Sequence, residues 1–300
     1  MARPRGWRNQ VWETDHVQAP VLVDVDCVAR KPWITWFTDC ATNAIMGVAV
    51  AGGARTAAVR HRFISRSSPD EQAPPLARLL RGGGRGGSAR LKLYLSMLWL
   101  SRNEDAPLYT YPAHQWALLM GLDDPERSGA LRIQEAIRWL DREGFVSQER
   151  QQGAPSHIRL LSDTGDGRPY RAPGLTMRKA TKQEKAANLY VQLAAGFWTK
   201  GWVAHLSGAT IAMYLVLLHE QMGEENKSVW IAPRMGQERF DLSDETRRKG
   251  LKELVDQSLA AVRKRPLHQG LFNEAYRTRN VYDLTPRGLD LHEYGHGPGF

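Results

Sequence analysis

The sequence predicts an α+β protein in which a small β-rich block precedes two copies of a mainly helical pattern that ends in a β-hairpin. Residues 88–163 and 205–290 carry the two copies, which match in the order helix, strand, helix, helix and hairpin. Residues 11–52 are instead rich in β-branched and aromatic side chains, with short gaps between the runs. The 300 residues, 42% of them hydrophobic, are enough to fill the cores of two or three domains.

The chain is strongly basic. A formal charge of +9 and a pI near 9.7 favour a polyanionic partner, most simply nucleic acid. No apolar run approaches the length of a membrane span, and the N-terminal arginines have no apolar stretch behind them to form a secretory signal. Cys27 and Cys40 lack the paired spacing of a zinc site, which predicts free thiols in a reducing compartment. We therefore expect a cytoplasmic, nucleoid-associated protein without a membrane segment, metal or cofactor.

The second copy contains a well-marked helix start. The Ser243 hydroxyl can accept from unpaired backbone N–H groups, and Asp244 and Glu245 suit the positive end of the helix dipole. Side chains of the helix that follows fall into two stripes. Small or apolar residues face a core, and basic residues face solvent: Gly250, Leu251 and Leu254 on one side, Arg248, Lys249 and Lys252 on the other. Residues 260–265 and 279–284 then predict a hairpin.

The first copy has the same parts. Its first helix is predicted over residues 91–100, and its second over 112–120. Asp124 can cap the third helix, with Pro125 at the first helical position. That helix is amphipathic, because apolar residues recur at i, i+3, i+4 and i+7: Ile133, Ala136, Ile137 and Leu140. Residues 144–150 and 156–161 complete the pattern with a hairpin.

Helix, turn, helix and hairpin in this order resemble a winged helix-turn-helix domain. The tandem pair resembles plasmid and phage replication initiators of the RepA kind, and also some transcription regulators. The resemblance implies that each third helix enters the major groove of double-stranded DNA while wing arginines contact phosphates. We expect DNA contacts from Arg127, Ser128, Arg132, Arg138, Arg150, Thr246, Arg248, Lys249, Lys252, Arg263, Lys264 and Arg265. Some winged helices bind only other proteins, and this alternative stays open, as does a homo-oligomer or a protein partner encoded by the same mobile element.

The N-terminal block carries a second resemblance. Runs at 19–26, 32–39 and 44–50 predict an antiparallel meander. Residues 12–16 (WETDH) and 31–47 (KPWITWFTDCATNAIMG) are similar to the opening of the RNase H-like catalytic core of integrase-type, Mu-like DDE transposases. The resemblance implies that Asp15 matches the first of three metal-binding carboxylates, and that Asp39 is structural. A strand transferase centred on Asp15 is the competing, enzymatic hypothesis, which requires all three carboxylates.

The transposase-like pattern stops after Gly53, so we predict a truncated remnant without an intact triad. Counting alone offers Asp70 and Glu104 for the missing carboxylates, but both lie in loop-like sequence. The predicted domains are a β meander (1–53), a flexible Arg/Gly-rich linker (54–87), winged helix 1 (88–163), a linker with a helical segment (164–204), winged helix 2 (205–290) and a disordered tail (291–300).

The stretch 193–203 is unusually aromatic. We interpret it as a hydrophobic plug beneath the first helix of the second copy, because tryptophan buries a large area. The alternative function for Trp198 or Trp202 is base stacking.

Overall fold

The computed structural model describes the backbone of residues 12–18, 23–25, 28–30, 33–39 and 45–51. It also describes residues 56–82, 84–101, 105–151, 154–177, 181, 184–185, 188–221, 227–266 and 278–289, with the side chains of 84, 85, 286 and 289 left out. The chain mixes helix and strand, and its sheets are small and antiparallel. The tail after Leu291 and the expected wing tip around 268–277 lie outside the described residues.

The N-terminal block is a three-stranded antiparallel sheet in the order β1-β4-β5, formed by β1 (Trp12–Gln18), β4 (Trp33–Asp39) and β5 (Ile45–Ala51). A separate hairpin joins β2 (Val23–Val25) to β3 (Val28–Arg30). The predicted meander is therefore confirmed for its last two strands and wrong for its first, which is β1 instead of the run at 19–26. Of the predicted run at 19–26, the described residues 23–25 pair with β3 and not with β4, whose two sides are taken by β1 and β5.

The first copy has every predicted element in the predicted order. Its helices are α3 (Gly84–Leu100), α4 (Ala113–Leu119) and α5 (Ala130–Arg142), with a π-helical turn η1 (Pro125–Gly129) before α5. Strand β7 (Leu108–Tyr109) joins β8 (Val146–Glu149) and β9 (His157–Leu160) in a sheet of order β7-β9-β8. The predicted cap is confirmed, since the Asp124 carboxylate accepts a hydrogen bond from the Ser128 amide at 3.3 Å.

The second copy also follows the predicted order. It contains α10 (Gly208–Gln221), α11 (Pro233–Phe240), α12 (Asp244–Asp256), the hairpin β11 (Ala260–Pro266) with β12 (Thr278–Leu284), and a final turn α13 (Pro286–Leu289). The expected strand at 228–232 is reduced to one bridge between Val229 and Tyr282. Ser243 caps α12 as predicted, because its hydroxyl accepts from the Thr246 amide at 3.1 Å.

The expected flexible linker at 54–87 is wrong where it is described. It contains β6 (Ala57–Arg60), α1 (His61–Ile64) and α2 (Pro75–Leu80), whose apolar side chains are almost fully buried. The segment 164–204 likewise contains α6 (Pro173–Met177), β10 (Tyr190–Leu193), α8 (Gly196–Thr199) and α9 (Trp202–His205). Strand β10 pairs with β6, so these two segments build one sheet instead of two tethers. Average composition concealed short apolar clusters such as Phe63-Ile64, which are enough to anchor a segment.

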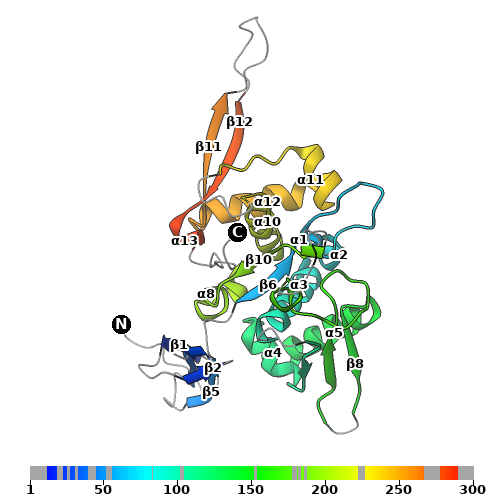
Figure 1. Ribbon diagram of the computed structural model, residues 1–300, viewed down its shortest axis with the longest axis vertical. Helices are drawn as coiled ribbons and strands as arrows, with labels where there is room; N and C mark the ends of the chain where they lie inside the picture. The colour runs from blue at the N-terminus through cyan, green and yellow to red at the C-terminus, as the bar shows by residue number, and fades with distance from the viewer. Residues whose placement is uncertain are drawn as a thin grey trace, which may run out of the picture.

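The two copies share one continuous hydrophobic core. Helices α3 and α10 approach so closely that a side chain on Gly208 would lie 2.9 Å from the Ser88 Cα. Figure 1 shows these helices in the middle of the molecule, with the β8–β9 hairpin at one end and β11–β12 at the other. None of the described helices is long and apolar enough to span a membrane.

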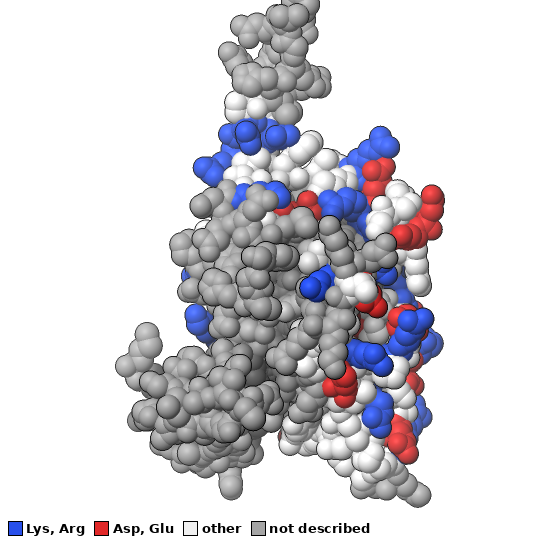
Figure 2. Space-filling view, in the orientation of Figure 1, with Lys and Arg blue, Asp and Glu red and all other residues white. Residues whose placement is uncertain are grey.

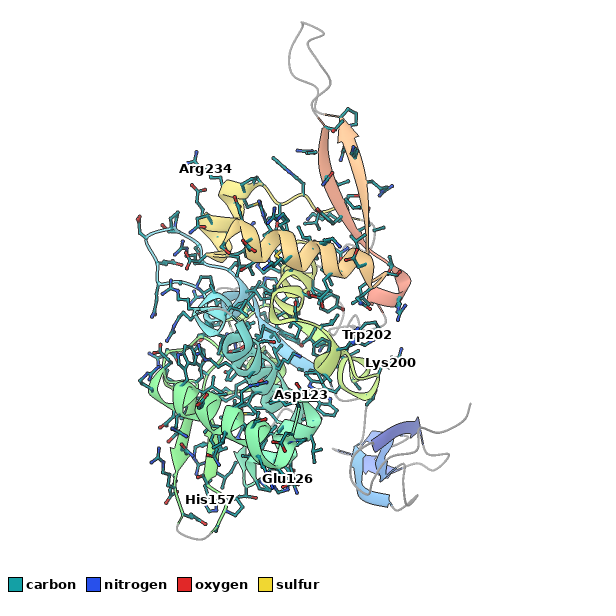
Figure 3. The ribbon with its side chains drawn as sticks, turned by 180° about the vertical axis from the view of Figure 1, so that it is seen from behind. Asp123, Glu126, His157, Lys200, Trp202 and Arg234 are labelled. Atoms are coloured by element: carbon teal, nitrogen blue, oxygen red, sulfur yellow. The ribbon has the colours of Figure 1, made fainter. Side chains whose placement is uncertain are left out.

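The aromatic segment is buried, as the plug interpretation predicts, but it packs on a different helix. Trp198 stacks on Trp99 of α3 with ring centroids 4.8 Å apart, and its indole N–H donates to the Ser96 hydroxyl at 3.0 Å. Trp202 is 9% exposed and lies under the Arg287 guanidinium, near Lys200 in Figure 3. The aromatic segment therefore packs against α3 of the first copy instead of α10 of the second.

Candidate nucleic-acid interface

The third helices of the two copies, α5 and α12, correspond residue by residue. Their buried faces align Ala136 with Gly250, Ile137 with Leu251, and Leu140 with Leu254. Both helices are followed by a left-handed residue, with φ 75° at Gly144 and φ 57° at Ser258, after which the hairpin begins. Each helix thus presents its opposite face to solvent beside a hairpin.

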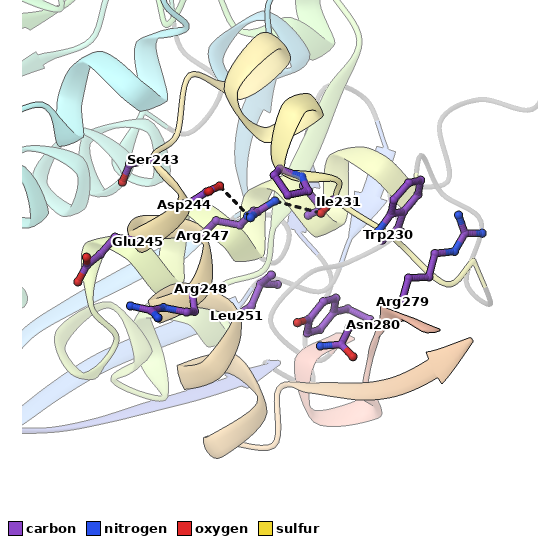
Figure 4. A pocket seen from close by; sticks show the side chains of 12 residues that line it. Trp230, Ile231, Ser243, Asp244, Glu245, Arg247, Arg248, Leu251, Arg279 and Asn280 are labelled. Atoms are coloured by element: carbon purple, nitrogen blue, oxygen red, sulfur yellow. Dashed lines mark hydrogen bonds and ion pairs between the residues drawn. The ribbon is translucent and has the colours of Figure 1, made fainter. Parts of the chain in front are cut away.

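A groove of about 800 Å³ runs between α12 and strand β12 (Figure 4). On one side Arg248 and Glu245 project from α12, and on the other Trp230 and Arg279 lie together. The Arg279 guanidinium carbon lies 4.4 Å above the centre of the Trp230 ring, whose side chain is 42% exposed. The complete lining is Trp230, Ile231, Pro233, Ser243, Asp244, Glu245, Arg247, Arg248, Leu251, Arg279, Asn280 and Tyr282.

The solvent face of α12 is less basic than the sequence predicts. Lys249 pairs with Glu245 at 2.8 Å, and Lys252 pairs with Asp256 at 2.6 Å, both one turn away along the helix. Hydrogen bonding to Lys249 lowers the pKa of Glu245. Arg248 is exposed and takes part in none of the ion pairs among the described residues. Two of the three predicted cations on this face therefore already have carboxylate partners, and the i,i+4 spacing of both pairs was the signal in the sequence that could have revealed them.

The predicted wing cations lie on β11 and are exposed. Arg263 already has partners within the protein, because its guanidinium pairs with Asp283 at 2.9 Å and also donates to the Ser228 hydroxyl. Lys264 and Arg265 make no ion pair among the described residues. Figure 2 shows Lys and Arg gathered where this hairpin leaves the body of the protein.

The first copy has a smaller groove, of about 450 Å³, in the matching place between α5 and its hairpin. None of the described residues that line it carries a charge: Tyr111, Pro112, Ala113, Gln134, Ile137, Gln148, Ala154, Pro155, Ser156 and Ile158. Leu131, one turn before Gln134, is 58% exposed. Figure 3 labels Asp123 and Glu126, which mark the turn that leads into α5.

The predicted DNA-contact residues of the first copy differ in their solvent exposure and in their hydrogen bonding. Arg127, Arg138 and Arg150 are exposed, and Arg132 is partly buried. Ser128 is engaged in the turn before α5, because its hydroxyl donates to the Asp123 carbonyl. Thr246 of the second copy is similarly engaged, with its hydroxyl 2.9 Å from that of Ser243. Both short side chains therefore support a helix start.

Sequence reasoning missed Gln134, Leu131, Trp230 and Arg279. The first two lie on the exposed face of a helix that was correctly predicted, so their position in the amphipathic pattern was the available signal. The Trp230–Arg279 contact had no such signal, because tertiary contacts bring β12 beside residues 229–231: the bridge between Val229 and Tyr282 and the hydrogen bond from Ser228 to Asp283.

The carboxylates of the enzymatic hypothesis are not assembled by the described part of the chain. Asp15 lies on β1 opposite Trp36, and its side chain is outside the described residues, as is Glu104. Asp70 is exposed in a turn. Among the described residues, no group of three or more His, Cys, Asp or Glu side chains is placed to hold a metal ion.

Buried ionisable groups gather at the junction between the copies. Asp163 is fully buried and pairs with Arg60, which also stacks over Tyr170. Burial raises the pKa of Asp163, while Arg60 lowers it. Burial lowers the pKa of Lys92 to about 8, and its ammonium donates to the Ala204 carbonyl at 2.9 Å. These groups hold elements together and do not face either groove.

Comparison of the chain with protein-family models, curated proteins and solved structures finds no match.

Proposed function

We propose that the protein binds double-stranded DNA without catalysing a reaction, through two tandem winged helices that share one core. It would act as a replication-initiator-like or transcription-regulatory factor of a mobile element. One observation carries the proposal. The exposed face of α12, the groove beside it and the basic strand β11 lie on adjoining parts of the second copy. Arg248 and Arg279 line the groove, and Lys264 and Arg265 on β11 lie opposite the groove residues Asn280 and Arg279 of β12. A helix beside a basic hairpin is the arrangement that reads a major groove while contacting phosphates.

Ion pairing among the described residues distinguishes the proposed DNA contacts from one another. Arg248 has no ion-pair partner among the described residues, whereas Lys252 must exchange Asp256 for a phosphate. Exposed pairs of this kind contribute only about 0–1 kcal/mol, so the exchange is inexpensive. Lys264 and Arg265 are better placed for phosphates than Arg263, which Asp283 holds.

Binding to a mixed-sequence duplex, measured across a salt series with the full chain, tests the proposal. We expect affinity to fall steeply with salt, since each phosphate contact releases counterions. The variant Arg248→Ala/Lys252→Ala should bind more weakly at unchanged helix content. The variant Lys264→Ala/Arg265→Ala should reduce the slope of log K against log salt by about 2, one for each lost contact.

A matched control is Arg234→Ala, because Arg234 is exposed on α11 but pairs with Glu238 and does not line the groove. It should leave both affinity and slope unchanged. No measurable binding by the full chain would overturn the proposal and favour a protein-interaction role for the two winged helices. Equal losses in the control and in the groove variants would show that binding is a general effect of charge.

A further inference from the structure

The two grooves have the same position in their copies but different chemistry. The alignment of α5 with α12 places Gln134 opposite Arg248, and both residues line their grooves. The neighbouring wall residues, Ile137 and Leu251, are also equivalent and equally apolar. The exchange of glutamine for arginine at one shared position is therefore the clearest chemical difference on the two helix faces.

Glutamine and arginine recognise different bases. The NH2 group of a glutamine side chain can donate to N7 of adenine while its carbonyl oxygen accepts from the N6 amino group, whereas arginine donates to both O6 and N7 of guanine. Both side chains are available in this protein. Gln134 is exposed and makes no hydrogen bond among the described residues, and Arg248 makes no ion pair there.

The surroundings of Gln134 suit an A·T pair. Leu131 lies one turn earlier on α5 and is 58% exposed, so its apolar side chain is open to contact with a ligand that meets this face. An apolar side chain beside a glutamine can contact the C5-methyl group of thymine. The aligned residue of α12 is Glu245, which pairs with Lys249 and offers no apolar contact.

We infer that the two copies read different base pairs: α5 an A·T pair through Gln134 and Leu131, and α12 a G·C pair through Arg248. The inference depends on the proposed DNA binding and adds the composition of the recognised site. An asymmetric site of this kind fixes the direction in which the chain lies on DNA, because the two ends of the site differ.

Selection of bound duplexes from a randomised library, using the full chain, is the first test. We expect two conserved segments, one with an essential A·T pair and one with an essential G·C pair. In the reciprocal exchange, Gln134→Arg should convert the A·T requirement to G·C, and Arg248→Gln should do the reverse. Each change of preference should be about 5- to 160-fold, since a bidentate contact discriminates by about 1–3 kcal/mol.

Replacement of thymine by uracil in the selected site tests Leu131 separately. Loss of the methyl contact should weaken binding by about three- to fivefold, as expected for one buried methyl group. The variant Leu131→Ala should bind thymine and uracil duplexes equally. Gln115→Arg on α4 is the control, because it adds the same charge outside both groove linings and should leave the preferences unchanged.

The outcomes separate the two proposals. Absence of DNA binding would overturn the proposed function itself. DNA binding with the same base preferences in wild type and exchange variants would leave that function standing and overturn the assignment of Gln134 and Arg248. Preferences that change equally in the Gln115→Arg control would also overturn the assignment.

Discussion

At the scale of single residues, a histidine pair at the junction is a pH-sensitive feature. The rings of His61 and His219 lie 4.5 Å apart, with Ser65 and Glu220 bonded to His219 on either side. Burial and, to a smaller extent, the neighbouring His219 together lower the pKa of His61 to about 4, while Glu220 opposes the shift. His61 therefore stays neutral when folded under conditions in which an unfolded chain would protonate it.

We expect this histidine to make the fold sensitive to mild acid. A folded pKa near 4 against an unfolded value near 6.5 means that stability is complete above about pH 6.5 and is lost as pH falls toward 4. Because His61 is partly exposed, solvent screening reduces its pH-dependent contribution to the free energy of unfolding to roughly 1–2 kcal/mol. We expect urea unfolding at several pH values to show that the free energy of unfolding falls less with decreasing pH in His61→Phe than in the wild type. Phenylalanine keeps an aromatic ring at this position but takes up no proton. Identical pH slopes in both proteins would contradict this prediction.

At the scale of elements, the contact between α10 and α12 sets how the third helix of the second copy is presented. Gly250 lies on α12 against the backbone of α10, and a Cβ there would come within 2.3 Å of the Ala209 carbonyl oxygen. It would also lie 2.6 Å from the Met213 Cγ. Since backbone atoms cannot move aside as a flexible side chain can, only glycine allows the two helices this close approach.

Substitution Gly250→Ala should therefore destabilise the protein by about 1–3 kcal/mol, in spite of the higher helix propensity of alanine. The matched control is Gly236→Ala on α11, where the nearest atom to a Cβ would be the Arg247 Cδ at 3.5 Å. The control should be neutral or slightly stabilising. Thermal unfolding of the two variants measures the difference, and equal melting temperatures would refute the close-packing argument.

At the scale of the whole molecule, a buried ion pair ties the two expected linkers to the first copy. The Arg60 amide donates to the Asp163 carboxylate at 3.0 Å, and its guanidinium also pairs with that carboxylate. The guanidinium further donates to the Asn188 side chain and the Arg171 carbonyl. One residue of β6 thus joins the end of the first copy to the strand β10 segment, which leads into the second.

We expect Asp163→Ala to cost about 3–5 kcal/mol, because it leaves the buried Arg60 charge without a partner. Adding Arg60→Met should recover part of that loss, since the double variant buries no unpaired charge. Chemical denaturation of the single and double variants measures both effects. A single variant within about 1 kcal/mol of wild type would show that the pair is not needed to join the copies.

Much of the second copy could be predicted from local patterns. The cap at Ser243, the apolar stripe of α12 and the hairpin strands depend on neighbouring residues, and all are confirmed. The groove contacts were harder to predict. The Trp230–Arg279 contact depends on residues far apart in the sequence, whereas the pairs of Lys249 with Glu245 and of Lys252 with Asp256 follow the i,i+4 spacing of a helix.

The sequence by itself determined the two copies and the order of their elements, because amphipathic spacing, caps and turns act within a few residues. Tertiary structure alone decided that the segments around β6 and β10 form the junction, since their short apolar clusters become stable only when strands distant in sequence pair. It also decided which cations remain unpaired beside the grooves. Ion pairing and burial depend on distances in space, which composition and periodicity do not encode.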